Sequence, residues 1–376
     1  MGHTAAARPL TWLLALGLLV GIGAGITHTR LLWSPRTFED TRDLRRSTFA
    51  QTYHAARAVY APDEFPARDV LVLGNSRVWL AARRSFTEPV LADRLAPAPV
   101  GLRNLAIFGA GLGDLEMLSR HVVRRPARLL LVTVGTSDLA GSTMAPLAGI
   151  PSDLLRRGWT PSPVGPESLG ERIDRWGRTL WPLYGFRELA RAALLDRLRP
   201  DRGARPLPAH FTNTRDVFAL MYGERAERVD TAFRIWLARG TLAAFVAYLQ
   251  ETGGTNLDLV EQRAGIRAAL DLAAPGPRAL DMLLGRLAAT EIPARVLVMP
   301  EHPVLAQDVA GRYHDPVRDA QAFELVTEIA GRHGVPVTDG RRWLPREAFI
   351  DFDHPFPELG GFHVRLVEDV ADALAS

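Results

Sequence analysis

Two segments at opposite ends of the chain carry residue types that suit nucleophilic catalysis. Ser76 directly follows a short apolar run, and Asp351 and His354 stand close together near the C-terminus. A serine hydroxyl is a poor nucleophile until an imidazole takes its proton, and the imidazole needs a carboxylate to fix its tautomer. The residue types therefore predict a catalytic triad with Ser76 as nucleophile, His354 as general base and Asp351 as the orienting carboxylate.

Alternatives to these roles stay open. Ser76 also suits an ordinary helix N-cap, because serine is favoured at that position. His302 is a rival general base, and Asp353 is a rival orienting carboxylate. A metal site is a further alternative, although its residues match no known ligand spacing. Its ligands would be Asp351, Asp353, His354 and His363.

Groups near the ends of three apolar runs can stabilise the negative charge on a reacting carbonyl. Ser76 at a helix start offers backbone N–H groups, and Gly109 permits close approach of a ligand. The Ser137 hydroxyl, after the third run, can also donate. We predict an oxyanion hole from Ser76, Gly109 and Ser137. The glycines near Gly109 do not indicate a dinucleotide site, because Asp114 stands where the GxGxxG pattern requires its third glycine. The remaining candidate pocket residues are Asn75, Arg77, Asn104, Glu301 and His302.

Five short apolar runs bounded by turn residues predict the elements that position these groups. They are residues 69–73, 102–107, 128–134, 294–299 and 335–338. Their β-branched content and lack of alternation suit parallel strands that are buried on both faces. Helical patterns between them predict a doubly wound parallel sheet with helices on both sides. Ligands of such sheets gather at the carboxyl ends of the strands, where the candidate residues lie.

The interval 141–274 departs from this alternation of strand and helix. It contains no convincing strand pattern but has helical stretches at residues 189–198, 231–249 and 257–273. We interpret it as a helical insertion within an α/β domain that spans residues 67–376. Residues 34–66 are polar and are predicted to form a helical connector ahead of that domain.

The N-terminal segment, residues 1–33, contains an uncharged apolar stretch at 9–27. At ~1.5 Å per residue a helix of this length spans about 30 Å, the thickness of a bilayer's hydrocarbon core. We predict a retained signal anchor in the cytoplasmic membrane, with the body of the protein outside the cytoplasm, in the periplasm. Secretion after cleavage of a signal peptide is the alternative.

Composition narrows the possible function classes. The 376 residues include 45 basic and 42 acidic side chains, and every basic side chain is Arg because Lys is absent. The arginines are interspersed with acids, so no nucleic-acid partner is expected. The absence of Cys excludes thiol nucleophiles, Cys-ligated zinc and disulfides. With 47% hydrophobic and 23% charged residues, disorder and a multi-span membrane protein are also excluded.

Four motifs together resemble the SGNH, or GDSL-type, hydrolase family. They are VLVLGNSRV, NLAIFGAG, LVTVGTSDL and DFDHP, in this order along the chain. The resemblance implies a flavodoxin-like, three-layer α/β/α fold with Ser76 as nucleophile, Gly109 as oxyanion donor, His354 as base and Asp351 as its orienter. Two positions depart from the family pattern. Asn75 replaces the usual Asp before the nucleophile, and Ser137 stands where the family has an oxyanion Asn.

The anchor, the LGNSR motif and the long insertion resemble SGNH proteins that accompany membrane-bound O-acyltransferases. This layout implies a serine esterase or O-acyltransferase acting on O-acyl groups, O-acetyl above all, of extracytoplasmic polysaccharide, with such a membrane enzyme as partner and no cofactor. An inert SGNH scaffold that binds glycan or this partner is the alternative, favoured by the Ser137 departure. A flavodoxin-like ligand-binding domain is a third hypothesis and predicts cofactor absorbance or phosphate affinity.

Overall fold

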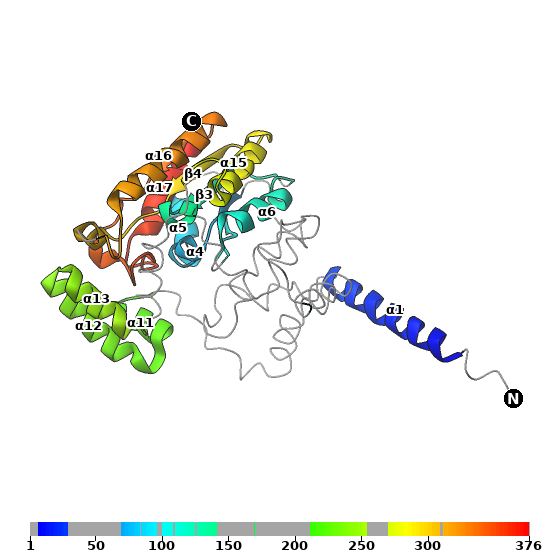
Figure 1. The fold of residues 1–376 in the computed structure, drawn as a ribbon, viewed down its shortest axis with the longest axis horizontal. Helices are drawn as coiled ribbons and strands as arrows, with labels where there is room; N and C mark the ends of the chain where they lie inside the picture. The colour runs from blue at the N-terminus through cyan, green and yellow to red at the C-terminus, as the bar shows by residue number, and fades with distance from the viewer. Residues whose placement is uncertain are drawn as a thin grey trace.

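A five-stranded sheet, parallel throughout, lies among the helices of the α/β part of the molecule (Figure 1). The computed structural model describes residues 7–28, 69–82, 84–95, 100–107, 110–124, 126–140, 169, 211–253, 270–308 and 311–375. The strands are β1 (Val70–Leu73), β2 (Leu102–Asn104), β3 (Leu129–Val134), β4 (Ala294–Val298) and β5 (Val337–Asp339). Each of the five predicted strands is observed, which confirms the α/β class.

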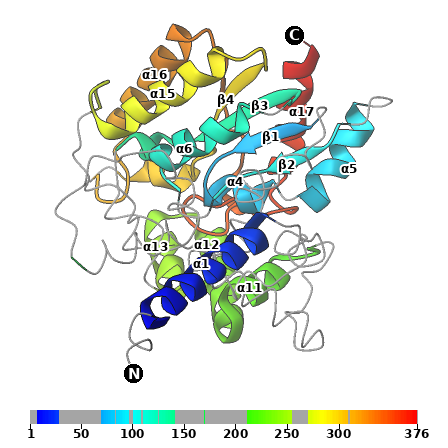
Figure 2. The same cartoon turned by 90° about the vertical axis from the view of Figure 1, so that its right-hand side faces the viewer.

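Helices cover both faces of the sheet, because successive strand residues point to opposite sides. Leu71 and Leu73 of β1 belong to one buried cluster, and Val70 and Val72 belong to another. The first cluster is closed by α6 (Leu112–Val122), α15 (Pro275–Ala288) and α16 (Pro316–Arg332). The second is closed by α4 (Ser76–Ala81), α5 (Arg84–Arg94) and α17 (Phe362–Ala375) (Figure 2). The sheet is therefore apolar on both faces, as its sequence predicts.

The strand order β2-β1-β3-β4-β5 places β1 beside β3 at the point where the chain changes direction across the sheet. Connections leave these two neighbours toward opposite sides, so a crevice opens at their carboxyl ends. Residues 74–77 follow β1 and residues 135–138 follow β3. The topology thus brings two of the candidate motifs to the same edge.

Two glycines at this edge allow backbone and side chains to approach closely. A Cβ atom on Gly74 would lie 2.0 Å from the Thr133 hydroxyl oxygen of the neighbouring strand. A Cβ atom on Gly135 would lie 1.4 Å from Nη1 of Arg77. Neither position can hold a larger residue without displacing its neighbour.

Three helices from the predicted insertion form a unit with its own aromatic core. They are α11 (Thr214–Tyr222), α12 (Ala226–Arg239) and α13 (Leu242–Glu251). The expected single helix over 231–249 is wrong: Gly240, with φ 66°, ends α12, and Thr241 caps α13 by accepting from the Ala244 N–H. Glycine adopts this left-handed conformation readily, so the chain turns there.

The helical unit packs against the loop that carries the C-terminal candidate residues. Phe233 and Tyr248 share a buried cluster with Ile350 and Phe356. The Tyr248 hydroxyl also donates a hydrogen bond to the Ile350 carbonyl. The unit therefore supports the DFDHP segment from outside the sheet.

Short 3₁₀ turns connect several elements. They are η2 (Thr136–Ala140), η4 (Gly223–Arg225), η5 (Pro303–Gln307) and η6 (Arg346–Ala348). The first follows β3 and the third follows β4, so both lie at the carboxyl edge of the sheet.

The N-terminal helix α1 (Ala7–His28) exposes large apolar side chains, among them Trp12 and Leu13. Among the residues that the structure describes, no helix has the length and hydropathy needed to cross a membrane. The predicted membrane-spanning segment at 9–27 is therefore not confirmed. The connector at 34–66 and the helical stretch at 189–198 lie outside the described residues, as does 257–269.

Candidate active site

Ser76 is the first residue of α4, directly beyond the carboxyl end of β1. Asn75 caps this helix: its side-chain oxygen accepts from the Arg77 N–H at 3.2 Å. The Asn75 amide also donates to Oδ2 of Asp138 at 3.1 Å, which ties the β1 and β3 turns together. Asn75, and not Ser76, is therefore the N-cap, so the Ser76 hydroxyl is not needed for capping.

His354 is presented by a tight turn between Ile350 and Pro355. The Ile350 N–H donates to the His354 carbonyl at 2.8 Å, and Phe349 pairs with Pro355 in an antiparallel bridge. Oδ1 of Asp351 accepts the backbone N–H groups of Asp353 at 3.0 Å and His354 at 2.9 Å. One carboxylate thus holds the turn in the shape that aims the imidazole.

The turn brings His354 to Ser76, although the two residues are far apart in the chain. His354 Nε2 lies 2.8 Å from Ser76 Oγ, within hydrogen-bond distance. On the other side of the ring, Nδ1 lies 2.9 Å from both carboxylate oxygens of Asp351. Oδ1 of Asp353 is also 2.9 Å from Nδ1. The structure therefore places both candidate carboxylates, rather than one of them, against the same nitrogen.

The two carboxylates dominate the protonation of the imidazole. Burial alone would lower the pKa of His354, but the negative charges of Asp351 and Asp353 outweigh it and raise the pKa to about 10. Because Nδ1 faces carboxylates, it carries the proton, and the neutral ring has its lone pair on Nε2 toward Ser76. This arrangement can remove a proton from the serine hydroxyl once the imidazolium has lost its own.

Arg77 links the β1 turn, the β3 turn and the histidine loop. Its Nε donates to Oδ2 of Asp353 at 2.9 Å, and its Nη2 donates to Ser137 Oγ at 2.6 Å. The side chain is buried, so burial disfavours its charge. The carboxylates of Asp138, Asp353 and Glu301 nevertheless keep the pKa of Arg77 above its ordinary value. Arg77 therefore neutralises part of the negative charge beside His354.

The predicted oxyanion donors have different outcomes. Ser137 lies at the edge of the site and accepts from Arg77, which leaves its own O–H able to donate. Gly109 lies outside the described residues. Asn104 does not serve the site: its amide donates to the Val78, Trp79 and Ala82 carbonyls, at 3.0, 3.3 and 3.1 Å, and so caps the end of α4. The prediction that Asn104 lines the pocket is wrong.

His302 is also misplaced by sequence reasoning. It is buried against the rings of Trp236, Phe245 and Phe349. Its Nδ1 accepts from the Val304 N–H at 3.1 Å, and burial lowers the pKa of His302 to about 3. His302 is thus a neutral core residue at neutral pH and not a rival base or a pocket residue.

A cavity of about 100 Å³ lies beside the triad rather than over it. Arg77, Ser137 and Asp353 form the wall nearest the triad, and Glu301 lies on the cavity wall as well, as predicted. The Thr136 hydroxyl donates to the Glu301 carboxylate. Burial and the charge of Asp319 raise the pKa of Glu301 to about 8. The cavity is therefore a polar space that opens next to the nucleophile's helix.

Sequence reasoning missed His314 and Asp319, which line the same cavity from the loop before α16 and from its first turn. No motif marks either residue. The alternative metal site is only partly assembled: Asp351, Asp353 and His354 come together, but His363 is not among them. Since both ring nitrogens of His354 face Ser76 or the carboxylates, this group is arranged for proton transfer rather than for metal binding.

No family model matches the chain, and no curated protein matches it.

Proposed function

We propose that this protein is a serine-dependent esterase or O-acyltransferase of the SGNH type. One observation carries the proposal, a line of hydrogen-bonding contacts through the His354 ring. Nε2 lies 2.8 Å from Ser76 Oγ, and Nδ1 lies 2.9 Å from the Asp351 carboxylate. In this mechanism His354 takes the serine proton and Ser76 attacks the ester carbonyl. The ester C–O bond then breaks, and the alcohol leaves with the proton that His354 returns. Water or a sugar hydroxyl, deprotonated by His354, takes the acyl group and frees Ser76. The parallel sheet with β1 beside β3 supports a flavodoxin-like core of the SGNH kind.

The substrate class rests on resemblance. The proposed substrates are O-acyl, above all O-acetyl, groups of an extracytoplasmic polysaccharide, and the proposed partner is a membrane-bound O-acyltransferase. The exposed apolar residues of α1 are compatible with a location at the outer side of the cytoplasmic membrane. Hydrolysis and transfer share the acyl-enzyme and differ in whether water or a sugar hydroxyl reaches it.

A fluorophosphonate probe tests the proposal, because it modifies only a serine whose hydroxyl is activated. The purified wild-type protein is expected to be labelled, and Ser76→Ala is expected to lose the label completely. Ser119→Ala is the matched control, since the Ser119 hydroxyl is buried in α6 and donates to the Glu116 carbonyl; it should label as wild type does. Wild-type protein that is folded and unlabelled would contradict the proposal.

The absence of labelling would favour an inert SGNH scaffold that binds glycan or a membrane partner. One observation supports this second candidate: Ser137 stands in place of the family's oxyanion Asn and is already bonded to Arg77. The loss of one oxyanion donor costs about 3–4 kcal/mol of transition-state stabilisation. The positive charge of Arg77 polarises the Ser137 hydroxyl, however, and this makes it a stronger donor.

We expect ester turnover to rise with pH well above neutrality. The general base is the neutral imidazole, and the carboxylates hold the pKa of His354 at about 10 instead of 6.5. The kcat/KM for an aryl acetate, corrected with Ser76→Ala as blank, should therefore increase from pH 7 toward pH 10. Asp353→Asn removes one of the two charges that favour the imidazolium, so the midpoint of the variant's pH profile should lie at a lower pH than that of the wild type. A wild-type profile that is flat above pH 7 would contradict this assignment.

A further inference from the structure

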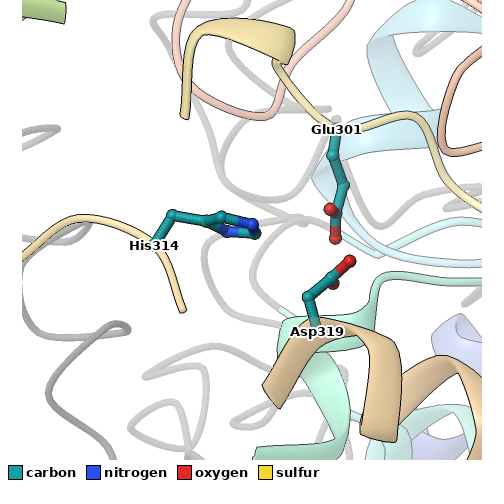
Figure 3. A group of neighbouring side chains, drawn as sticks. All are labelled: Glu301, His314 and Asp319. Carbon is teal, nitrogen blue, oxygen red and sulfur yellow. The ribbon is translucent and has the colours of Figure 1, made fainter. Parts of the chain in front are cut away.

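The cavity beside the triad contains a second group of titratable side chains that ester chemistry does not use. Glu301 follows β4, His314 belongs to the loop before α16, and Asp319 lies in the first turn of that helix. One ligand-type atom from each residue lies within 4.8 Å of the other two. Figure 3 shows the carboxylates of Glu301 and Asp319 pointing toward each other and the His314 ring directed at both. Three chain segments thus converge on one point.

Each of the three residues is held from its outer side. The Thr136 hydroxyl donates to Oε1 of Glu301, and Nη1 of Arg341 donates to Oδ2 of Asp319 at 3.3 Å. The loop that bears His314 is fixed because its backbone N–H donates to the Asp308 carboxylate at 3.0 Å. Outer hydrogen bonds of this kind orient the first ligands of metal sites.

Among the residues that the structure describes, none donates a hydrogen bond to Oδ1 of Asp319, which is buried. Two buried carboxyl groups that face each other are stabilised by a proton or by a cation between them. Two carboxylate oxygens and one imidazole nitrogen form a ligand set that suits first-row divalent cations.

We propose that Glu301, His314 and Asp319 bind one divalent transition-metal cation, of the Zn²⁺ or Mn²⁺ type. Ligand atoms around a tetrahedral zinc lie roughly 3.4 Å apart. The three ligand atoms here all lie within 4.8 Å of one another, so small side-chain rotations bring them to that spacing. Three protein ligands leave a coordination position that faces the cavity, where water or a ligand oxygen completes the shell. The site is distinct from the triad and does not depend on the proposed ester chemistry.

Calorimetric titration of the chelator-treated full chain with ZnCl₂, and separately with MnCl₂, tests this inference. We expect one equivalent of at least one cation to bind to the wild type. Glu301→Gln and His314→Ala should each weaken this binding by at least tenfold. His333→Ala is the matched control, because His333 at the end of α16 pairs with Asp281 of α15, 2.9 Å away and apart from the cavity group. This variant should bind the cation as the wild type does.

Three outcomes would overturn the inference. The first is that neither cation binds the wild type below about 1 mM. The second is that Glu301→Gln and His314→Ala both bind the cation as tightly as the wild type does. The third is that His354→Ala loses binding while His314→Ala keeps it, because this result would assign the cation to the triad. Thermal unfolding in chelator shows whether Glu301→Gln is folded. We expect it to be folded, because glutamine has nearly the same shape as glutamate and carries no charge beside Asp319. Fluorophosphonate labelling in chelator is read separately, so failure of the cation site and failure of the serine mechanism are distinguishable.

Discussion

His354→Ala is expected to lower kcat/KM for an aryl acetate by about 10⁴- to 10⁶-fold, into the range of triad histidine losses in serine hydrolases. The reason is geometric. Nε2 of His354 is 2.8 Å from the Ser76 hydroxyl, and no other imidazole in the described part of the chain lies within hydrogen-bond distance of that hydroxyl. Without this ring the serine keeps its proton at neutral pH and attacks ester carbonyls slowly.

The control for this variant is His333→Ala, which removes an imidazole from the partly exposed pair with Asp281. It should keep wild-type turnover and unfold at nearly the wild-type temperature. His354→Ala leaves Asp351 and Asp353 without the imidazolium and should unfold at a lower temperature, so its rate is measured where it is folded. The measurement is the initial rate over a range of substrate concentrations, with Ser76→Ala as blank. A His354→Ala rate within tenfold of wild type would remove His354 from the mechanism.

The sheet was predictable because burial leaves a direct trace in the sequence. Strands such as β1 and β3 are buried at every position, so each reads as an unbroken apolar run. The positions of Ser76 and Ser137 followed from the rule that ligands meet at the carboxyl ends of parallel strands. The break at Gly240 was missed because the apolar period continues across it, and only the local backbone conformation separates α12 from α13.

The side-chain contacts of the site were less predictable than its backbone frame. His302 follows β4 at the correct edge, yet its ring turns into the aromatic cluster with Trp236 and Phe245. Asn104 is the last residue of β2, and its amide satisfies carbonyl groups at the end of α4. A place at the end of a strand fixes the backbone position of a residue. The direction of its side chain depends on the packing of distant segments.

Arg77 and the group Glu301, His314 and Asp319 illustrate the same limit. Arg77 appeared in the sequence only as a pocket candidate, but it bonds to residues from two other segments, Asp353 and Ser137. The three cavity residues lack the local spacing that marks many metal motifs, since they come from a strand end, a loop and a helix. Convergence of this kind becomes visible only in three dimensions.

The two aspartates at His354 differ in what else they bind, and this difference predicts unequal roles. Asp351 presents both oxygens to Nδ1 and accepts two backbone N–H groups through Oδ1. Asp353 offers one oxygen to Nδ1, while its other oxygen accepts from Arg77. Part of the charge of Asp353 is therefore neutralised by the arginine, so Asp351 is the stronger stabiliser of the imidazolium.

Asp351→Asn is accordingly expected to reduce kcat/KM by about 10³-fold, somewhat less than the ~10⁴ known for an orienting Asp-to-Asn change. The loss is smaller because the charge of Asp353, with Oδ1 2.9 Å from Nδ1, still stabilises the imidazolium. The asparagine oxygen can still accept both backbone N–H groups, so the turn should persist. At pH values where the imidazole is neutral in both proteins, Asp353→Asn should cost about tenfold. In the double variant the losses should exceed the product of the single ones, since each aspartate then lacks the other as a substitute. A larger loss in Asp353→Asn than in Asp351→Asn, measured by the same kcat/KM assay on folded proteins, would make Asp353 the orienting carboxylate.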